Sequence, residues 1–216
     1  LGTTLAIIVF YKKTLFTNLF TKKKLTFYLK LLLASIPAGI IGLLFQDYIT
    51  SKLHSTVVIA ISLIVVGFLF IILENSKRES SKTKIENIPT WKMVVIGIAQ
   101  SLALIPGTSR SGITTLTGMV LGLEKYTAFT FSFILGIPIL LGSTIYEIIK
   151  SYLDSGEPSL FTASMAVVRI APWVLVTFLI GYVSLHLVNR FKKSKWLTVF
   201  GIYRILLGLL ILLLAI

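Results

Sequence analysis

The stretch Trp91–Leu123, WKMVVIGIAQSLALIPGTSRSGITTLTGMVLGL, decides how this chain folds. It contains two apolar runs, Met93–Ile105 and Ile113–Leu123, separated by the polar sequence Pro106–Gly112. A helix needs about 20 apolar residues to cross a bilayer, so neither run crosses alone. The stretch is therefore either one broken crossing or a re-entrant pair that enters and leaves the membrane on the same side.

The rest of the chain has the composition of a helical membrane protein. Of its 216 residues, 56% are hydrophobic and only 13% are charged, and the mean hydropathy is +0.93. Soluble domains are about half apolar and a quarter charged, so we expect an all-α, polytopic membrane bundle that forms a single domain over residues 1–216. The absence of cysteine excludes disulfides, thiolate metal sites and cysteine nucleophiles. The expected spans are residues 1–11 (partial), 27–45, 55–74, 126–149, 165–188 and 196–216.

Loop charges decide how Trp91–Leu123 meets the membrane. The chain has 21 Lys and Arg against 8 Asp and Glu, a net charge of +13. Basic residues collect in the cytoplasmic loops of membrane proteins, which explains this excess without a nucleic-acid partner. The loops expected inside are the Lys-rich first connection, Asn75–Lys92 and Asn189–Lys195, and those expected outside are Gln46–His54 and Ser151–Pro158. With one crossing at 126–149, Trp91–Leu123 must begin and end inside, so it is predicted to be a re-entrant helix–loop–helix hairpin, and the C-terminus is expected outside.

The polar sequence in the hairpin predicts an anion site. An arginine near the bilayer centre costs at least about 2.5 kcal/mol, so Arg110 needs a ligand or, alternatively, a carboxylate partner in a polar helix joint. Ser111 or Gly112 is expected to cap a helix that begins near Ile113, which would point free N–H groups at an anion. The predicted phosphate-binding residues are Gly107, Thr108, Ser109, Arg110, Ser111, Gly112 and Thr114.

The same residues carry a family resemblance. The motif Gln100-x-x-Ala-Leu-Ile-Pro-Gly-Thr-Ser-Arg-Ser-Gly-x-Thr114 is followed by Gly118, Gly122, Phe131–Phe133 and Pro138. Leu1-Gly-Thr, Tyr11-Lys, Ile36–Gly39 and Tyr203-Arg204 accompany it in order. Together these residues resemble the undecaprenyl-diphosphate phosphatases of bacterial cell envelopes, the bacitracin-resistance type, over essentially the whole chain.

The resemblance implies an activity and a location. The implied reaction hydrolyses undecaprenyl diphosphate to undecaprenyl phosphate and phosphate, which recycles the lipid carrier for peptidoglycan synthesis and confers bacitracin resistance. The implied protein is a multi-pass enzyme of the bacterial inner membrane, built from inverted repeats, with its active site facing the outer side; a homodimer is left open. The alternative is a transporter or translocase for an anionic polyprenyl phosphate, because transporters also bind anions at broken helices.

The resemblance also implies roles for individual residues. Ser109 and Arg110 are expected to be catalytic, with Arg110 binding the diphosphate and Ser109 acting as a nucleophile only if a base lies nearby. Gln100 and Arg204 are added to the substrate-binding residues. For Arg204, which lies between apolar runs, an internal salt bridge is an equal alternative.

One part of the family pattern has no match in this sequence. The family's Glu-rich hairpin followed by Ser-Ser-x-Gly-His is expected in an upstream segment before Leu1. That segment is also expected to supply most ligands of a divalent cation, Mg²⁺ or Ca²⁺, and no metal ligand is assigned within the chain. The chain would then hold the substrate-binding half of a divided active site, which leaves open whether it is active by itself.

Overall fold

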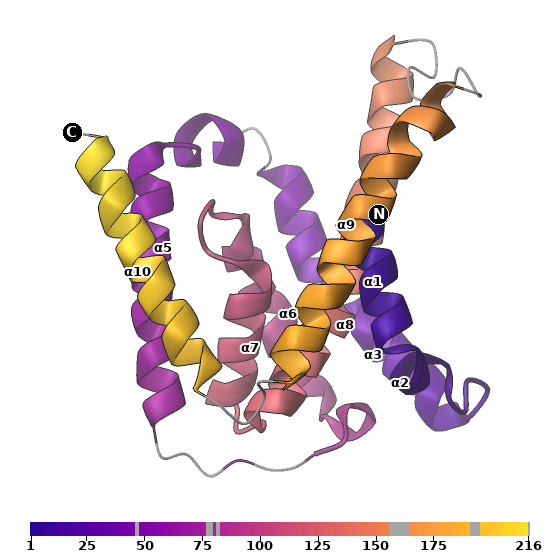
Figure 1. Cartoon of the computed structure of the whole chain (residues 1–216). Helices are drawn as coiled ribbons and strands as arrows, with labels where there is room; N and C mark the ends of the chain where they lie inside the picture. The colour runs from indigo at the N-terminus through magenta and orange to yellow at the C-terminus, as the bar shows by residue number, and fades with distance from the viewer. Residues whose placement is uncertain (46–47, 77–79, 81–82, 156–164, 191–194, 216) are drawn as a thin grey trace. The chain divides into compact units, whose positions relative to one another are not determined.

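A computed structural model describes residues 1–45, 48–76, 80, 83–155, 165–190 and 195–215 (Figure 1). Every regular element in these ranges is a helix, and none of the described residues lies in a strand. The predicted all-α fold is therefore confirmed. The chain forms two compact units, residues Leu1–Leu19 with Gly136–Arg190 and residues Phe20–Leu135 with Phe191–Ile216, which we describe separately.

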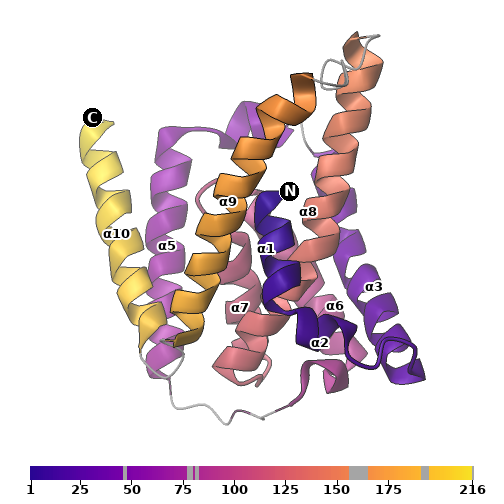
Figure 2. The ribbon, with the colours of Figure 1, turned by 45° about the vertical axis from the view of Figure 1, so that its right-hand side comes forward.

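The first unit is built around a packed pair of helices. It contains α1 (Gly2–Phe10), α2 (Lys12–Phe16), the later part of α8 (Lys125–Ser155) and α9 (Met165–Arg190). Helix α1 packs along α9 (Figure 2). The approach is close because Gly2 has no side chain, and a Cβ at Gly2 would collide with Val174 and Thr177 of α9.

The second unit contains the stretch Trp91–Leu123. Its long helices are α3 (Lys22–Leu44), α5 (Thr56–Asn75) and α10 (Trp196–Leu214), together with the start of α8. The hairpin consists of α6 (Thr90–Ala99), the 3-10 turn η3 (Gln100–Leu104) and α7 (Arg110–Val120). The remaining elements are the π-helical η1 (Ile49–Leu53) and the 3-10 turn η2 (Ile85–Asn87).

Five described helices are long and apolar enough to cross a membrane. They are Lys22–Leu44, Thr56–Asn75, Lys125–Lys150, Ile170–Arg190 and Trp196–Leu214. Each matches one predicted span, so the chain is a multi-pass membrane protein. Helix α3 begins at Lys22, five residues before the expected residue 27, and its first turn includes Lys24, which is only 2% exposed and forms an ion pair of 2.7 Å with Glu86. The predicted outer loop Ser151–Pro158 does not begin at Ser151, because α8 continues to Ser155; residues 156–158 of this loop and 191–194 of the predicted inner loop Asn189–Lys195 lie outside the described residues.

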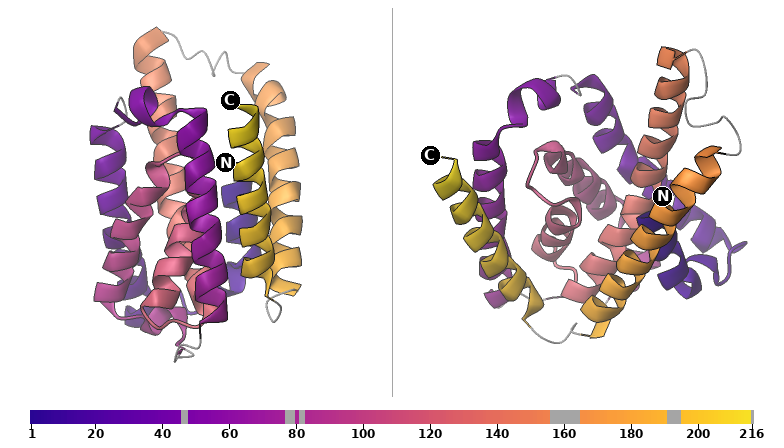
Figure 3. Two further views of the ribbon diagram at one scale, coloured as in Figure 1. Left: turned by 90° about the vertical axis from the view of Figure 1, so that its left-hand side faces the viewer. Right: turned by 45° about the horizontal axis from the view of Figure 1, so that its top comes forward.

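Helices α5 and α10 lie side by side in the second unit (Figure 3). Their backbones meet at glycines: a Cβ on Gly201 would lie 2.6 Å from the carbonyl oxygen of Gly67, and one on Gly208 would lie 2.8 Å from that of Ala60. Small residues allow such close approach between membrane helices. This crossing brings Arg204, one turn beyond Gly201, into the interior of the unit.

The hairpin reverses direction where the sequence predicted a break. Helices α6 and α7 pack against each other, and α6 also packs on α3. Neither α6 with 10 residues nor α7 with 11 is long enough to cross a bilayer. The broken hairpin is therefore confirmed, and its relation to a second, inverted repeat stays a prediction.

Candidate anion-binding site

The connection between η3 and α7 is a tight turn that only glycine can make at one position. The N–H of Thr108 donates to the carbonyl oxygen of Ile105 at 3.2 Å. Gly107 has a φ of +87°, and a Cβ there would lie 2.6 Å from the carbonyl oxygen of Ile59 on α5. Positive φ and the lack of space both require glycine. The loop is thus pressed against the backbone of α5.

Helix α7 begins at Arg110, so the predicted start near Ile113 is wrong by one turn. Ser109, not Ser111 or Gly112, is the N-cap: its Oγ accepts a hydrogen bond from the N–H of Gly112 at 3.3 Å. Ser109 adopts a φ of 64°, which lets its side chain reach back over the helix end. The N–H groups of Arg110 and Ser111 consequently lie in the first turn, where the helix provides no acceptor and its dipole favours an anion.

The side chain of Arg110 is held by the neighbouring helix α8. Its Nη1 donates to the carbonyl oxygen of Ser132 at 3.4 Å. Thr114 Oγ1 lies 2.5 Å from Ser132 Oγ and also donates to the carbonyl oxygen of Arg110 at 2.8 Å. The ion pairs Lys24–Glu86 and Lys125–Glu74 do not involve Arg110, which has no carboxylate partner among the described residues. This favours the anion site over the polar helix joint.

Ser132 is a site residue that the sequence analysis missed. It is fully buried, and its hydroxyl donates to the carbonyl oxygen of Ser111 at 3.1 Å. Its signal in the sequence is a hydroxyl between the two aromatic residues of Phe131–Phe133, a segment noted only for its family resemblance. Ser132 contacts both ends of the Arg110–Thr114 turn and so holds it in place.

Helix α10 also contacts the loop, through Arg204. This residue is 4% exposed, and its Nη2 donates to the carbonyl oxygen of Gly107. Its guanidinium carbon lies 5.9 Å from the ring centre of Phe70 and 5.8 Å from that of Phe200. The salt bridge offered as one alternative for Arg204 is not formed with any described residue. Contact between Arg204 and a substrate stays a prediction.

Gln100 is buried with its amide unused. It lies where α6 passes into η3, is 2% exposed, and neither Nε2 nor Oε1 has a hydrogen-bond partner among the described residues. Thr115 of α7 is 1% exposed, and its Oγ1 is also without a partner in that part of the chain. An unsatisfied buried polar group costs about 1–3 kcal/mol, so a ligand or water is expected to complete these groups.

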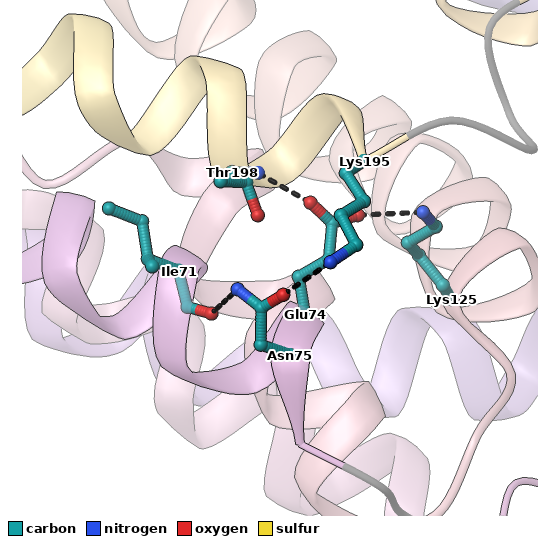
Figure 4. A network of polar contacts seen from close by, with 6 residues as sticks. All are labelled: Ile71, Glu74, Asn75, Lys125, Lys195 and Thr198. Carbon is teal, nitrogen blue, oxygen red and sulfur yellow. Dashed lines mark hydrogen bonds and ion pairs between the residues drawn. The ribbon is translucent and has the colours of Figure 1, made fainter.

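A polar network fixes the helix ends at one side of the second unit (Figure 4). The carboxylate of Glu74 accepts from Lys125 Nζ at 2.7 Å and from the N–H of Thr198 at 2.5 Å. Beside it, Lys195 Nζ donates to Asn75 Oδ1 at 2.8 Å. The network joins the end of α5 to the starts of α8 and α10, the two helices that carry Ser132 and Arg204.

The site lacks the groups that a divalent cation would need. The described residues contain no cluster of three or more His, Cys, Asp or Glu side chains. The loop instead presents a guanidinium group and hydroxyls, and these do not fit Mg²⁺ or Ca²⁺, which bind carboxylate and carbonyl oxygens. No His or carboxylate hydrogen-bonds to Ser109 Oγ in the described part of the chain, so a base for that hydroxyl is not found there.

The fold defines a multi-pass helical membrane protein, and the loop at the start of α7 is its candidate anion site. The chain belongs to the family described as "Bacitracin resistance protein BacA", which it matches over residues 1–210. Three similar proteins are each named undecaprenyl-diphosphatase. One from Enterococcus faecalis is 38% identical over 99% of this chain and 78% of its own length. One from Methylobacillus flagellatus is 36% identical (98% and 79%), and one from Acetivibrio thermocellus is 37% identical (99% and 79%).

Proposed function

We propose that this protein is an integral membrane undecaprenyl-diphosphatase. It hydrolyses undecaprenyl diphosphate to undecaprenyl phosphate and phosphate, recycles the lipid carrier for cell-wall synthesis and confers resistance to bacitracin. The family and the names of the similar proteins support the reaction. The structural observation that carries it is the loop at the start of α7, where Arg110 and Arg204 each donate to a backbone carbonyl and neither has a carboxylate partner among the described residues.

The terminal phosphate binds at the first turn of α7. Arg110 and the N–H groups of Arg110 and Ser111 neutralise its oxygens, and the hydroxyls of Thr108 and Ser109 complete the cradle. Stabilising the charge that develops on the transferring phosphoryl group accounts for most of the catalysis in such sites. Water attacks the terminal phosphorus. The bond between this phosphorus and the bridging oxygen breaks, and the lipid monophosphate leaves. Attack by Ser109 itself would require a general base that the described residues do not offer.

Gln100 is the second ligand-binding group. Its Nε2 can donate to a phosphate oxygen and its Oε1 can accept from a water, and these bonds would satisfy both unpartnered atoms. Its burial at the junction of α6 and η3 supports this role, because a ligand would remove the penalty of the unpaired amide. Gly107 and Gly112 have no side chains, so the backbone at both positions can lie close to α5. Thr114 holds the turn.

Three further features belong to the proposal. A requirement for Mg²⁺ or Ca²⁺ is expected from the family resemblance and is tested by chelation followed by addition of either ion; no step above depends on it. The inner membrane and an outward-facing site are expected from the family resemblance, and the basic loops expected inside support the orientation of the chain. A homodimer is tested by the mass of the detergent-solubilised protein.

The reaction is tested with the purified chain in detergent. We expect one phosphate released per undecaprenyl diphosphate, with undecaprenyl monophosphate as the lipid product identified by mass spectrometry. Undecaprenyl monophosphate, offered as a control substrate, should release nothing because it lacks the anhydride bond. Absence of release from the diphosphate, or equal release from the monophosphate, would contradict the proposal.

A further inference from the structure

We propose that Arg204 is a positioning residue that fixes the Gly107–Thr108 peptide group and thereby orients the anion-binding turn of α7. The inference rests on the function proposed above and assigns Arg204 to the protein's own loop, where the sequence predicted a contact with substrate or an internal salt bridge. It starts from the hydrogen bond that Arg204 Nη2 donates to the carbonyl oxygen of Gly107.

The peptide group between Gly107 and Thr108 is held on both of its sides. Its carbonyl oxygen accepts from Arg204, and its N–H donates to the carbonyl oxygen of Ile105 at 3.2 Å. Because a peptide group is planar, these two bonds fix the direction of one plane. Rotating the plane would break both bonds at once. The loop therefore has one stable orientation as long as Arg204 is present.

The residues on either side of that plane need such support. Gly107 has a φ of +87° and Ser109 a φ of 64°, and the latter is an uncommon conformation for a residue with a side chain. Strained positions of this kind persist when the surroundings over-determine them. The conformation of Ser109 lets its Oγ cap Gly112 and leaves the N–H groups of Arg110 and Ser111 free for an anion. Loss of the fixed plane is expected to release that cap.

Arg204 is itself rigidly held. Its guanidinium lies near the rings of Phe70 and Phe200, and the close crossing of Gly201 and Gly67 anchors α10 one turn away. A hydrogen bond from a charged donor is about twice as strong as a neutral one. No described carboxylate compensates the charge, so Arg204 also raises the positive potential of the loop without needing to touch the phosphate.

The test compares three variants of the full chain in detergent: Arg204→Ala, Arg204→Lys and the control Leu206→Ala, whose side chain is 62% exposed on the same helix. We expect Arg204→Ala to lower kcat by about 100-fold with little change in KM, as for loss of a preorganised donor. Guanidinium ion added below denaturing concentrations should restore part of the kcat of Arg204→Ala. Lysine should restore little, because it lacks the planar fork. Hydrogen exchange should increase in the peptide covering residues 105–112 while α5 and the rest of α10 stay protected.

The outcomes distinguish the positioning role of Arg204 from the phosphatase function proposed for the chain. An Arg204→Ala variant with wild-type kcat, or one in which only KM rises as expected for a lost substrate ligand, overturns the positioning role. Increased exchange throughout α5 and α10 would overturn it as well, because the effect would then be general unfolding. If the unmodified chain releases no phosphate, the proposed function fails; the exchange comparison still tests whether Arg204 orders the loop.

Discussion

Two hydroxyl groups hold the turn that carries Arg110. Thr114 Oγ1 and Ser132 Oγ lie 2.5 Å apart, and each also lies within hydrogen-bond distance of a backbone carbonyl of the first turn of α7. Each hydroxyl has one proton, so one of the two donates to the other, and the second donates to a carbonyl. The pair thus connects α7 to α8 without a charge. Arg110 can then keep its guanidinium for an anion.

Removing one of these hydroxyls should loosen the turn. We expect Ser132→Ala to lower the free energy of unfolding by about 1–3 kcal/mol, because Thr114 and the Ser111 carbonyl lose a buried partner. Thermal melting in detergent measures the effect. Ser143→Ala is the matched control, an exposed serine of α8 whose hydroxyl donates to the Leu140 carbonyl of the same helix. Equal melting temperatures for the two variants would contradict this role of Ser132.

Gly107 provides a second test at the scale of one residue. Gly107→Ala should abolish phosphate release and lower the melting temperature, because a Cβ would lie 2.6 Å from the Ile59 carbonyl oxygen at a positive φ. Gly142→Ala, where a Cβ meets nothing within 4 Å, should keep full activity and leave stability equal or higher. Activity retained in Gly107→Ala would show that the loop does not need this conformation.

The junction of three helix ends determines how the elements carrying the site are placed. Glu74 at the end of α5 caps the first turn of α10 through the Thr198 N–H and pairs with Lys125 at the start of α8. Its side chain is 4% exposed. Because α8 and α10 carry Ser132 and Arg204, we expect a change at the junction to be transmitted to the loop along both helices.

Breaking that junction should reduce stability before it affects chemistry. We expect Glu74→Gln to lower the free energy of unfolding by about 1–3 kcal/mol, because the amide keeps the size of the side chain but loses the charge that pairs with Lys125. Chemical denaturation in mixed micelles measures it. Glu147→Gln, at an exposed position of α8, is the control and should change little. A larger loss in the control would contradict the structural role of Glu74.

The sequence predicted the elements better than the contacts between them. The five long helices and the broken hairpin follow from apolar runs and their lengths, which are local properties. The start of α7 was misplaced because Ser109, Ser111 and Gly112 are all acceptable caps, and only the positive φ at Ser109 selects one. The roles of Ser132 and Arg204 depend on packing between segments far apart in the chain, and no periodicity indicates them.

At the scale of the whole molecule, the orientation in the membrane can be tested directly. The chain contains no cysteine, so single cysteines can be introduced without background. We expect His54→Cys to react with an impermeant thiol reagent in intact cells and Ser80→Cys to react only after permeabilisation, because basic loops stay inside. Both positions are exposed. Labelling of Ser80→Cys from outside would reverse the proposed topology.

The most direct test of the central claim is phosphate release from undecaprenyl diphosphate by the unmodified chain, Arg110→Ala and the control Arg190→Ala, which removes an exposed arginine of α9. The account predicts release by the unmodified chain and by Arg190→Ala. It predicts a loss of at least about 100-fold in kcat/KM for Arg110→Ala, whose melting temperature should stay near that of the unmodified protein. Release by a folded Arg110→Ala protein at the unmodified rate would contradict the claim that the first turn of α7 binds the phosphate.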